Sequence, residues 1–357
     1  MCFILIFKEQ NNNLHNPYMN QGLTCLVFSL LFLSLGCQQE KKSTVQKEQP
    51  IKHQDTTLVK KQEEKPKVVT AEDIIIKKDL LYKKYTLEDT YPYKDTTRSF
   101  QWDKIKERLA YVENFQQTPS RYAVLQNYQN EKGEAPTIKD FKRDSYKRVS
   151  DSFNVERYQA APLYDPTTDK PVRYGRDGWL VRIKGSDTLA RVPIAGVSFE
   201  GEYTVPKRYL RLTSDSVQFN IINIVDVKNQ NICTLEKVGK EWLVRSMNPV
   251  TSGRHKPPHA QETPTGLFVV QEHKSKMFYF EDGTRTYGGF APYATRFTAG
   301  AYIHGVPVNN PNGSIIEYSE SLGTTPKSHM CVRNASSHAQ FVYKRSKDLS
   351  ALVIVID

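Results

Sequence analysis

The stretch SHMCVRN, from Ser328 to Asn334, holds the most reactive pattern of residue types in this 357-residue sequence. Its cysteine, Cys331, stands two positions after His329, and a further histidine, His304, occurs upstream in the segment YIHG. A cysteine with a histidine elsewhere in the chain is the minimal set for nucleophilic catalysis by a thiolate. A free thiol has a pKa near 8.5, so only a few per cent is ionised at neutral pH. A neighbouring base or an electropositive site has to raise that fraction.

The sequence around this stretch is rich in β-formers. Runs such as FNIINIVDV, WLVRSM, GLFVV and LVIVI between Val217 and Asp357 are strand-like, and Asn, Gly and Pro turns separate them. They predict a mostly antiparallel β-sandwich or barrel over 216–357. The segment SHAQFVYKR, from Ser337 to Arg345, is the one helix expected there, with His338 facing solvent.

Three segments of this region resemble, in their order, the L,D-transpeptidase (YkuD-like) catalytic domain. They are TPTG at 263–266, HG at His304–Gly305 and SHMCVRN at 328–334, and the stretch FAPYATRFTAGAYIHG also resembles the family's approach to its first histidine. The resemblance implies a bacterial cell-wall enzyme that acts on peptidoglycan stem peptides. Such an enzyme forms cross-links through a thioester on Cys331 and releases the terminal D-alanine of a tetrapeptide stem.

The resemblance also implies roles for individual residues. Cys331 is expected to attack the carbonyl of the residue before the D-alanine, and His304 to take the thiol proton. His329 is expected to act as an orienting partner or as a base. Backbone N–H groups around His329, Met330 and Cys331 are expected to form the oxyanion hole, worth roughly 3–4 kcal/mol per donor.

Four further residues are expected near the substrate. Arg333 would hold a substrate carboxylate by a bidentate contact, with a surface ion pair as the alternative, and Ser328, Gly305 and Asn334 would line the substrate site. Met330 stands where the family has glycine, and it fits if the backbone is ordinary at that point. Water as acceptor would instead make the protein an L,D-carboxypeptidase. Loss of catalysis, which Met330 motivates, would leave a peptidoglycan-binding lipoprotein.

No metal and no cofactor are expected. His255, His259 and His273 lie in a polar, Pro-rich stretch without metal-ligand spacing and are expected in loops. The formal net charge of +11 comes from Lys and Arg spread along the chain, which does not favour a nucleic-acid partner. Cys233 is interpreted as a small apolar strand residue, although an exported protein could pair it with Cys331.

Upstream of the catalytic region the sequence predicts two further folded parts. Residues 151–215 resemble a small Src-homology-3-like β-barrel, because APLYD and YTVPKRYLRL are similar to that family's first and last strands; wall binding and a structural spacer are both open roles. Residues 71–150 are expected to be partly helical. The run FQWDKIKERLAYVENF, Phe100 to Phe115, has apolar residues at helical spacing. The overall fold class is therefore mainly β.

The N-terminal segment suggests export. The apolar run LTCLVFSLLFLSLG, Leu23 to Gly36, is too short to span a bilayer and precedes Cys37, as in a lipoprotein leader. We expect a leader at 1–37, acylation of Cys37 that attaches the chain to a lipid membrane, and a periplasmic or cell-envelope location. A plain cleaved signal or a membrane anchor are the alternatives. Residues 38–70 are rich in Lys, Glu and Gln and are expected to be a disordered tether.

Overall fold

The strand that closes the chain, β21 (Ala351–Ile356), lies inside a six-stranded sheet in the computed structural model, which describes residues 67–357. Its six residues are all buried. Side chains alternate between the two faces of a strand. Ala351, Val353 and Val355 accordingly belong to one hydrophobic cluster and Leu352, Ile354 and Ile356 to another. A strand covered on both faces explains the unbroken apolar run ALVIVI.

This sheet mixes parallel and antiparallel pairs. β21 runs parallel to its neighbour β13, and β1 runs parallel to β15, whereas the other pairs are antiparallel. The spatial order is β1 (Ile75–Lys78), β15 (Glu241–Pro249), β14 (Asn231–Val238), β13 (Ile221–Asp226), β21 and β16 (Gly266–Val269).

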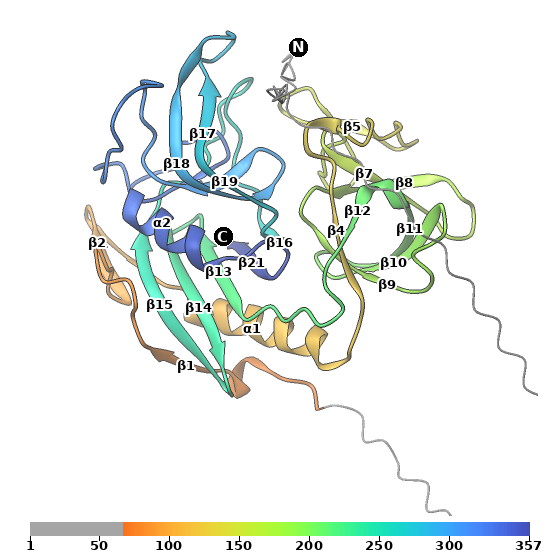
Figure 1. The fold of residues 1–357 in the computed structure, drawn as a ribbon, viewed down its shortest axis with the longest axis horizontal. Coiled ribbons are helices and arrows are strands. Elements are labelled where there is room, and N and C mark those ends of the chain that lie inside the picture. The colour runs from red at the N-terminus through yellow and green to blue at the C-terminus, as the bar shows by residue number, and fades with distance from the viewer. Residues whose placement is uncertain (1–66) are drawn as a thin grey trace, which may run out of the picture. The chain divides into compact units, whose positions relative to one another are not determined.

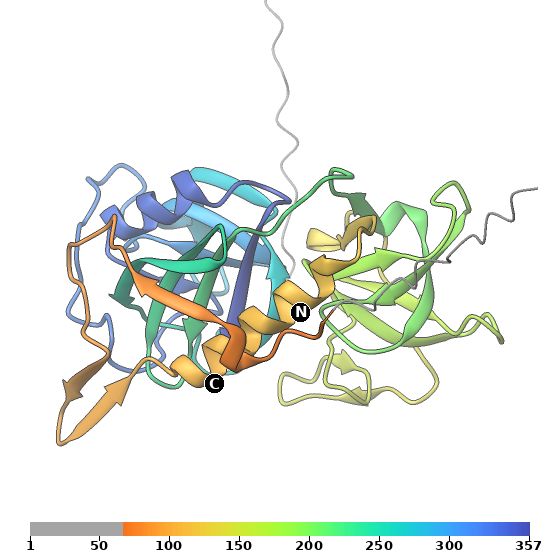
Figure 2. The same cartoon turned by 90° about the horizontal axis from the view of Figure 1, so that it is seen from below.

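A long helix, α1 (Trp102–Gln117), covers one face of the sheet, as Figures 1 and 2 show. Its residues Ile105, Leu109 and Val112 are almost completely buried and share a cluster with alternate residues of the sheet strands. The amphipathic helix predicted from Phe100 to Phe115 is confirmed, and its apolar stripe packs against the body of the protein.

A second, four-stranded sheet and helix α2 lie on the other face. The sheet consists of β17 (Glu272–Phe280), β18 (Tyr287–Thr298), β19 (Ala301–His304) and β20 (Val332–Arg333). Helix α2 (Ser336–Arg345) contacts β18 and β19, and its Val342 joins the cluster that contains Val353 and Val355. This helix begins one residue before the predicted start and ends where the sequence predicts. The mainly β fold class is confirmed.

The region expected as a small barrel forms a seven-stranded antiparallel sheet, to the right in Figure 1. The 3-10 turn η3 (Lys207–Tyr209) follows Pro206 and leads into β12. The strands lie in the order β12 (Leu210–Leu212), β4 (Tyr122–Leu125), β9 (Leu180–Ile183), β10 (Arg191–Gly196), β11 (Glu202–Pro206), β7 (Ala160–Tyr164) and β8 (Pro171–Arg176).

Residues 71–150 supply strands to both larger parts in addition to α1. Strand β1 extends the six-stranded sheet, and β4 lies between β12 and β9 in the barrel sheet. The remaining elements are short: η1 (Ala71–Asp73), the hairpin of β2 (Thr90–Tyr93) and β3 (Thr96–Ser99), η2 (Tyr128–Asn130), and the pair β5 (Lys142–Arg143) and β6 (Val149–Ser150).

The expected leader at 1–37, the acylation site Cys37 and most of the expected tether lie outside the described residues. Within 67–357, neither helix has the length and hydropathy needed to span a bilayer.

Candidate active site

Two neighbouring parallel strands bring the histidine and the cysteine together. Strand β19 pairs with β20 so that Ile303 lies opposite Val332 and His304 lies opposite Arg333. Ile303 and Val332 are fully buried and point into the core. Because neighbouring residues on a strand point to opposite faces, His304 and Arg333 face the other way, on the same side as Cys331.

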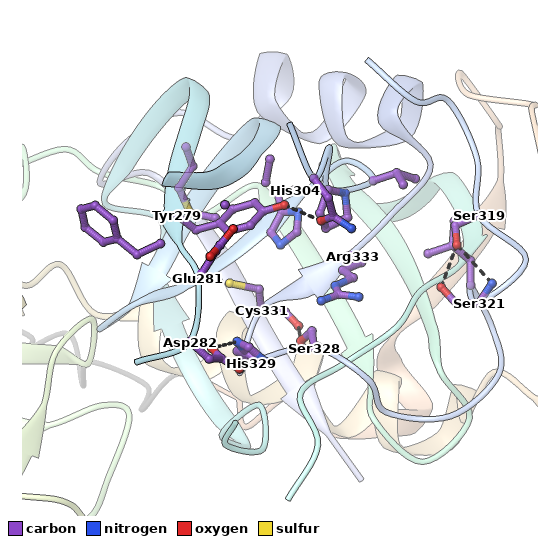
Figure 3. Close-up of a pocket in the computed structure, with 18 residues that line it drawn as sticks. Tyr279, Glu281, Asp282, His304, Ser319, Ser321, Ser328, His329, Cys331 and Arg333 are labelled. Carbon is purple, nitrogen blue, oxygen red and sulfur yellow. Dashed lines mark hydrogen bonds and ion pairs between the residues drawn. The ribbon is translucent and has the colours of Figure 1, made fainter. Parts of the chain in front are cut away.

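That side forms a cavity of about 650 Å³ beneath the β17–β18 hairpin. Figure 3 shows Cys331 near its centre, with His304 and Arg333 on different sides and His329 beside Asp282. The lining residues are Met277, Tyr279, Phe280, Glu281, Asp282, Gly288, Ala291, His304, Val306, Pro307, Asn309, Ser319, Ser321, Leu322, Ser328, His329, Cys331 and Arg333. Five of the residues expected in the site from the sequence therefore surround one space.

His304 is held in one tautomer by its own neighbour. Its Nδ1 lies 2.6 Å from the carbonyl oxygen of Gly305. A carbonyl oxygen only accepts hydrogen bonds, so Nδ1 carries the proton and Nε2 is left as an acceptor. Burial lowers the pKa of His304 to about 4; the Gly305 carbonyl raises it and the Arg333 charge lowers it further. The imidazole is therefore neutral at pH 7 and able to accept a proton.

Cys331 is a free thiol in the resting structure. Both Cys331 and Cys233 are free, so the alternative of a disulfide between them is excluded. The Cys331 Sγ donates to the carbonyl oxygen of Gly300 at 3.4 Å. Burial raises the pKa of the Cys331 thiol to about 11, although a backbone contact with Tyr302 and the Arg333 charge lower it. Cysteine and imidazole are thus both neutral before substrate binds.

Met330 occupies a backbone conformation suited to glycine. Its φ is +100°, a value that side-chain-bearing residues rarely adopt. The condition under which methionine was expected to fit, an ordinary backbone, is not met. Thr263 holds the strained peptide: its hydroxyl donates to the Met330 carbonyl at 2.7 Å and accepts from the Gly253 N–H at 2.8 Å. The first threonine of TPTG therefore supports the cysteine loop from behind.

Arg333 and Ser328 both face the cavity. Arg333 is partly buried and forms no ion pair with any carboxylate among residues 67–357, so the alternative of a surface ion pair does not describe it. Its Nε has no hydrogen-bond partner there. Ser328 is buried, and its hydroxyl donates to the Cys331 carbonyl. Ser328 thus fixes the backbone of the cysteine, while Arg333 presents an uncompensated positive charge.

His329 lies at the rim of the cavity. Its side chain is exposed, and its Nδ1 is 3.6 Å from Oδ1 of Asp282 at the tip of the β17–β18 hairpin. Partial burial lowers the pKa of His329, and the Asp282 charge opposes this effect. The side chains of both residues are exposed. Asp282 was not predicted from the sequence, because no motif includes it.

Gly305 and Asn334 lie outside the cavity, although both were expected at the substrate. A Cβ on Gly305 would lie 2.5 Å from the Ser336 Oγ, so this residue packs against the start of α2. Asn334 is fully buried; it donates to the Val332 carbonyl and lies 2.8 Å from His338. Both residues support the site from behind: Gly305 orients His304, and Asn334 ties β20 to α2.

The expected solvent position of His338 is wrong. The ring is fully buried, with Nδ1 2.8 Å from the Asn334 Oδ1 and Nε2 2.9 Å from the hydroxyl of Ser246 on β15. Helix α2 therefore turns this polar residue toward the six-stranded sheet, where two partners satisfy it. Burial lowers the pKa of His338 to about 3.

Two further histidines, His255 and His273, form contacts with carboxylates. His273 lies in strand β17 and not in the expected loop, with its Nδ1 2.6 Å from Asp348. His255 contacts Glu262 at 2.6 Å. Among residues 67–357, no three His, Cys, Asp or Glu side chains are grouped so that they could hold a metal ion.

Residues 221–355 match the family model YkuD, described as an L,D-transpeptidase catalytic domain. The comparison with curated proteins gave no match.

Among solved structures, the chain is similar to an L,D-transpeptidase from Mycobacterium smegmatis, with 18% identity, 50% of this chain and 82% of that chain covered, and a TM-score of 0.32. It is also similar to the L,D-transpeptidase LdtMt1 in complex with imipenem, with 15% identity, 55% and 78% covered, and a TM-score of 0.30. A fused Zn-dependent amidase/peptidase/peptidoglycan-binding protein from Clostridium acetobutylicum ATCC 824 has 18% identity, with 40% and 56% covered and a TM-score of 0.28. This chain spans just over half the length of that last protein.

Proposed function

We propose that the protein cross-links peptidoglycan stem peptides through a thioester on Cys331, because residues 221–355 match the model of the L,D-transpeptidase catalytic domain. The observation that carries the proposal is the shared cavity, in which Cys331 lies with His304 and Arg333. A thiol nucleophile, a neutral base and an unpaired cation are the groups that acyl transfer from a carboxylate-bearing peptide requires.

In the proposed first step, the thiol attacks the carbonyl carbon that precedes the terminal D-alanine. The C–S bond forms as the Nε2 of His304 takes the thiol proton, which is consistent with Nδ1 being protonated. The C–N bond to D-alanine then breaks, and His304 returns the proton to the departing amine. Because both groups are neutral at rest, the thiolate forms only as the substrate arrives.

The developing oxyanion needs donors near the cysteine. The backbone N–H groups of Met330 and Cys331 donate no hydrogen bond to any residue between 67 and 357, which leaves them available. Arg333 is the proposed partner of a substrate carboxylate, and His329 at the rim is the proposed contact for the incoming stem.

In the second step the amine of a neighbouring stem attacks the thioester, the C–S bond breaks and a C–N cross-link forms. If water attacks instead, the product is a trimmed stem, and the protein is an L,D-carboxypeptidase.

A muropeptide assay tests the proposal. The full chain and its Cys331→Ala variant are produced in a strain that lacks its own L,D-transpeptidases, and the muropeptides are analysed. Cross-links are expected with the unmodified chain and not with Cys331→Ala, whereas Cys233→Ala, which removes the other buried cysteine, is expected to retain them. Identical profiles for all three chains would favour the alternative that Met330 motivates, a non-catalytic peptidoglycan-binding protein.

Imipenem provides a direct probe of the nucleophile. We expect a covalent adduct on Cys331 by peptide mass spectrometry, because a thiolate opens the strained lactam by the same acyl chemistry. No adduct is expected on His304→Ala at neutral pH within the same time. An unmodified Cys331 in folded, unaltered protein would contradict the proposed role.

We also propose that the chain acts in the cell envelope and is held to a membrane through acylated Cys37, with the expected segments 1–37, 38–70, 71–150, 151–215 and 216–357 as its organisation. Support for the anchor comes from the LSLGC sequence alone. Metabolic labelling with a fatty-acid analogue is expected to label the full chain and not Cys37→Ala. Labelling of both would reject the anchor and leave the enzymatic proposal unaffected.

A further inference from the structure

A buried carboxylate links the barrel sheet to the cavity. Asp177, between β8 and β9, is completely buried. It accepts hydrogen bonds from the N–H of Asn127 at 2.9 Å and from Gln271 at 2.9 Å. It also accepts from the guanidinium of Arg296 at 2.7 Å and from the N–H of Ala299 at 2.8 Å. Three of these four donors lie in the catalytic region.

Arg296, the ion-pair partner of Asp177, is also buried. The exposed fraction of the Arg296 side chain is 6%, and the same guanidinium contacts Glu272 at 3.0 Å. Separating the two residues of a buried ion pair leaves a buried charge without a partner, which costs much free energy. The barrel and strand β18 are therefore fixed to each other at this point.

The contact continues into the turn between β18 and β19. Besides the Ala299 N–H, the hydroxyl of Thr298 donates to the Asp177 carbonyl at 2.6 Å. Ala299 has a φ of +38°, which an alanine rarely adopts without support. A Cβ on Gly178 would lie 2.0 Å from the Phe297 carbonyl oxygen, so the two backbones are in direct contact.

The next residue of this turn touches the nucleophile. The carbonyl oxygen of Gly300 accepts the thiol hydrogen of Cys331 at 3.4 Å. One continuous set of contacts thus runs from Asp177, through Thr298 and Ala299, to the Cys331 Sγ. We propose that Asp177 is a positioning residue for Cys331: it holds the turn whose carbonyl directs the thiol within the cavity. The proposal rests on Cys331 being the nucleophile.

The test compares two rates at Cys331 in the full chain and in Asp177→Ala. Acylation by imipenem is expected to slow by roughly tenfold or more, because small misplacements of a reacting atom have effects of that size. Alkylation by iodoacetamide is expected to become faster at pH 8. The S–H···O contact with Gly300 favours the protonated thiol, and the variant loses this contact. Both rates are read by peptide mass spectrometry.

Alkylation of Cys233 in the same samples shows whether the variant has lost structure in general. It is fully buried in β14 and outside the cavity. If Asp177 acts by positioning, Cys233 stays unalkylated while the Cys331 rates change. If Cys233 reacts in step with Cys331, Asp177 only stabilises the fold and the proposal is overturned.

Glu236→Gln serves as the matched control. Glu236 contacts Arg245 and Arg345, each at 2.6 Å, in a partly buried ionic cluster outside the cavity. This variant is expected to leave imipenem acylation unchanged, and an equal loss in both variants would overturn the proposal. If Asp177→Ala does not fold, Asp177→Asn replaces it; the asparagine oxygen can still accept from Ala299, and a smaller loss is expected.

Unchanged acylation in a folded Asp177 variant also overturns the proposal. Failure of the proposed function has a different signature: the unaltered chain itself would then show no imipenem adduct on Cys331.

Discussion

At the scale of single residues, Met330 is the most unusual position. Its φ of +100° is imposed by its surroundings, because a Cβ on Gly253 would lie 2.6 Å from the Met330 Cα and Thr263 binds its carbonyl. Such strain costs about 1–3 kcal/mol. Met330→Gly is therefore expected to raise the free energy of unfolding by about 1 kcal/mol, after allowance for the greater freedom of glycine in the unfolded chain.

Urea denaturation measures this difference. Gly253→Ala is the companion variant, because its new Cβ collides with the same backbone. It is expected to lower the free energy of unfolding. A Met330→Gly protein that is less stable than the unaltered chain would show that the conformation carries no strain.

The pH response of Cys331 follows from its burial. The thiol pKa is raised to about 11, so thiolate is the minor form throughout the neutral range. Below that pKa, each unit of pH increases the thiolate fraction about tenfold. Alkylation by iodoacetamide is expected to rise in this way from pH 7 to 10, without a plateau near 8.5. Arg333→Gln should slow it, since the Arg333 charge lowers the thiol pKa.

A rate that levels off near neutral pH would contradict this picture, because it would reveal a preformed thiolate–imidazolium pair. Cys233 again serves as the internal reference for alkylation of buried thiols.

At the scale of elements, helix α2 carries a pH-dependent contribution to stability. His338 is buried as a neutral ring with its pKa lowered to about 3, whereas an unfolded histidine titrates near 6.5. The unfolded chain therefore binds more protons between these values. Stability is complete above about pH 6.5 and is lost as pH falls toward 3, by at most about 1.4 kcal/mol per unit.

Unfolding free energies measured from pH 7 to 4 test this, with His338→Gln as the comparison. Glutamine can replace the hydrogen bonds to Ser246 or Asn334 but does not titrate in this range. The variant is expected to lose less stability on acidification. The remaining slope comes from the other groups with a shifted pKa, among them His304, whose pKa is lowered to about 4, and His329 and Glu262, whose pKa values are also lowered. Equal slopes in both proteins would exclude His338 as a source.

The sequence predicted both helices but not the surroundings of α2. The stripe Ile105, Leu109 and Val112 has apolar residues at helical spacing, and it is buried as expected. Helix α2 instead begins Ser-Ser-His, and its polar residues face partners on other elements. The spacing of apolar residues in a sequence predicts which face of a helix is buried. It does not reveal that a buried polar ring will meet Asn334 and Ser246.

At the scale of the whole molecule, the catalytic region depends on the segments before it. Helix α1 covers one face of the six-stranded sheet with Ile105, Leu109 and Val112. Losing even one large buried side chain costs about 2–5 kcal/mol, and whole domains have only about 5–15 kcal/mol of stability. A fragment of residues 216–357 is therefore expected not to fold.

Near-ultraviolet circular dichroism and amide NMR dispersion test this. A chain that starts at Pro66, which retains every described element, is expected to give native spectra under the same conditions. Native spectra from the 216–357 fragment would mean that the six-stranded sheet folds without helix α1.

The HG and SHMCVRN motifs predicted five residues that share the cavity, namely His304, Ser328, His329, Cys331 and Arg333. Gly305 and Asn334, which were also expected there, lie behind it. The motifs did not predict the positive φ of Met330, which depends on Gly253 behind it. The pair of Asp177 and Arg296 has no signature at all, since 119 positions separate the two residues and each is ordinary in its own segment. Coupling between distant segments arises only in three dimensions.

The close approach of Gly178 to Phe297 limits how this protein can be engineered. Because no side chain larger than hydrogen fits there, a chimaera that exchanges the barrel for another needs a glycine at the same point. It also needs an acid beside that glycine to neutralise Arg296. A graft without the acid would remove one of the two carboxylates that contact Arg296, and a graft without the glycine would place a side chain against the Phe297 carbonyl. The barrel and the catalytic region therefore have to be transplanted together.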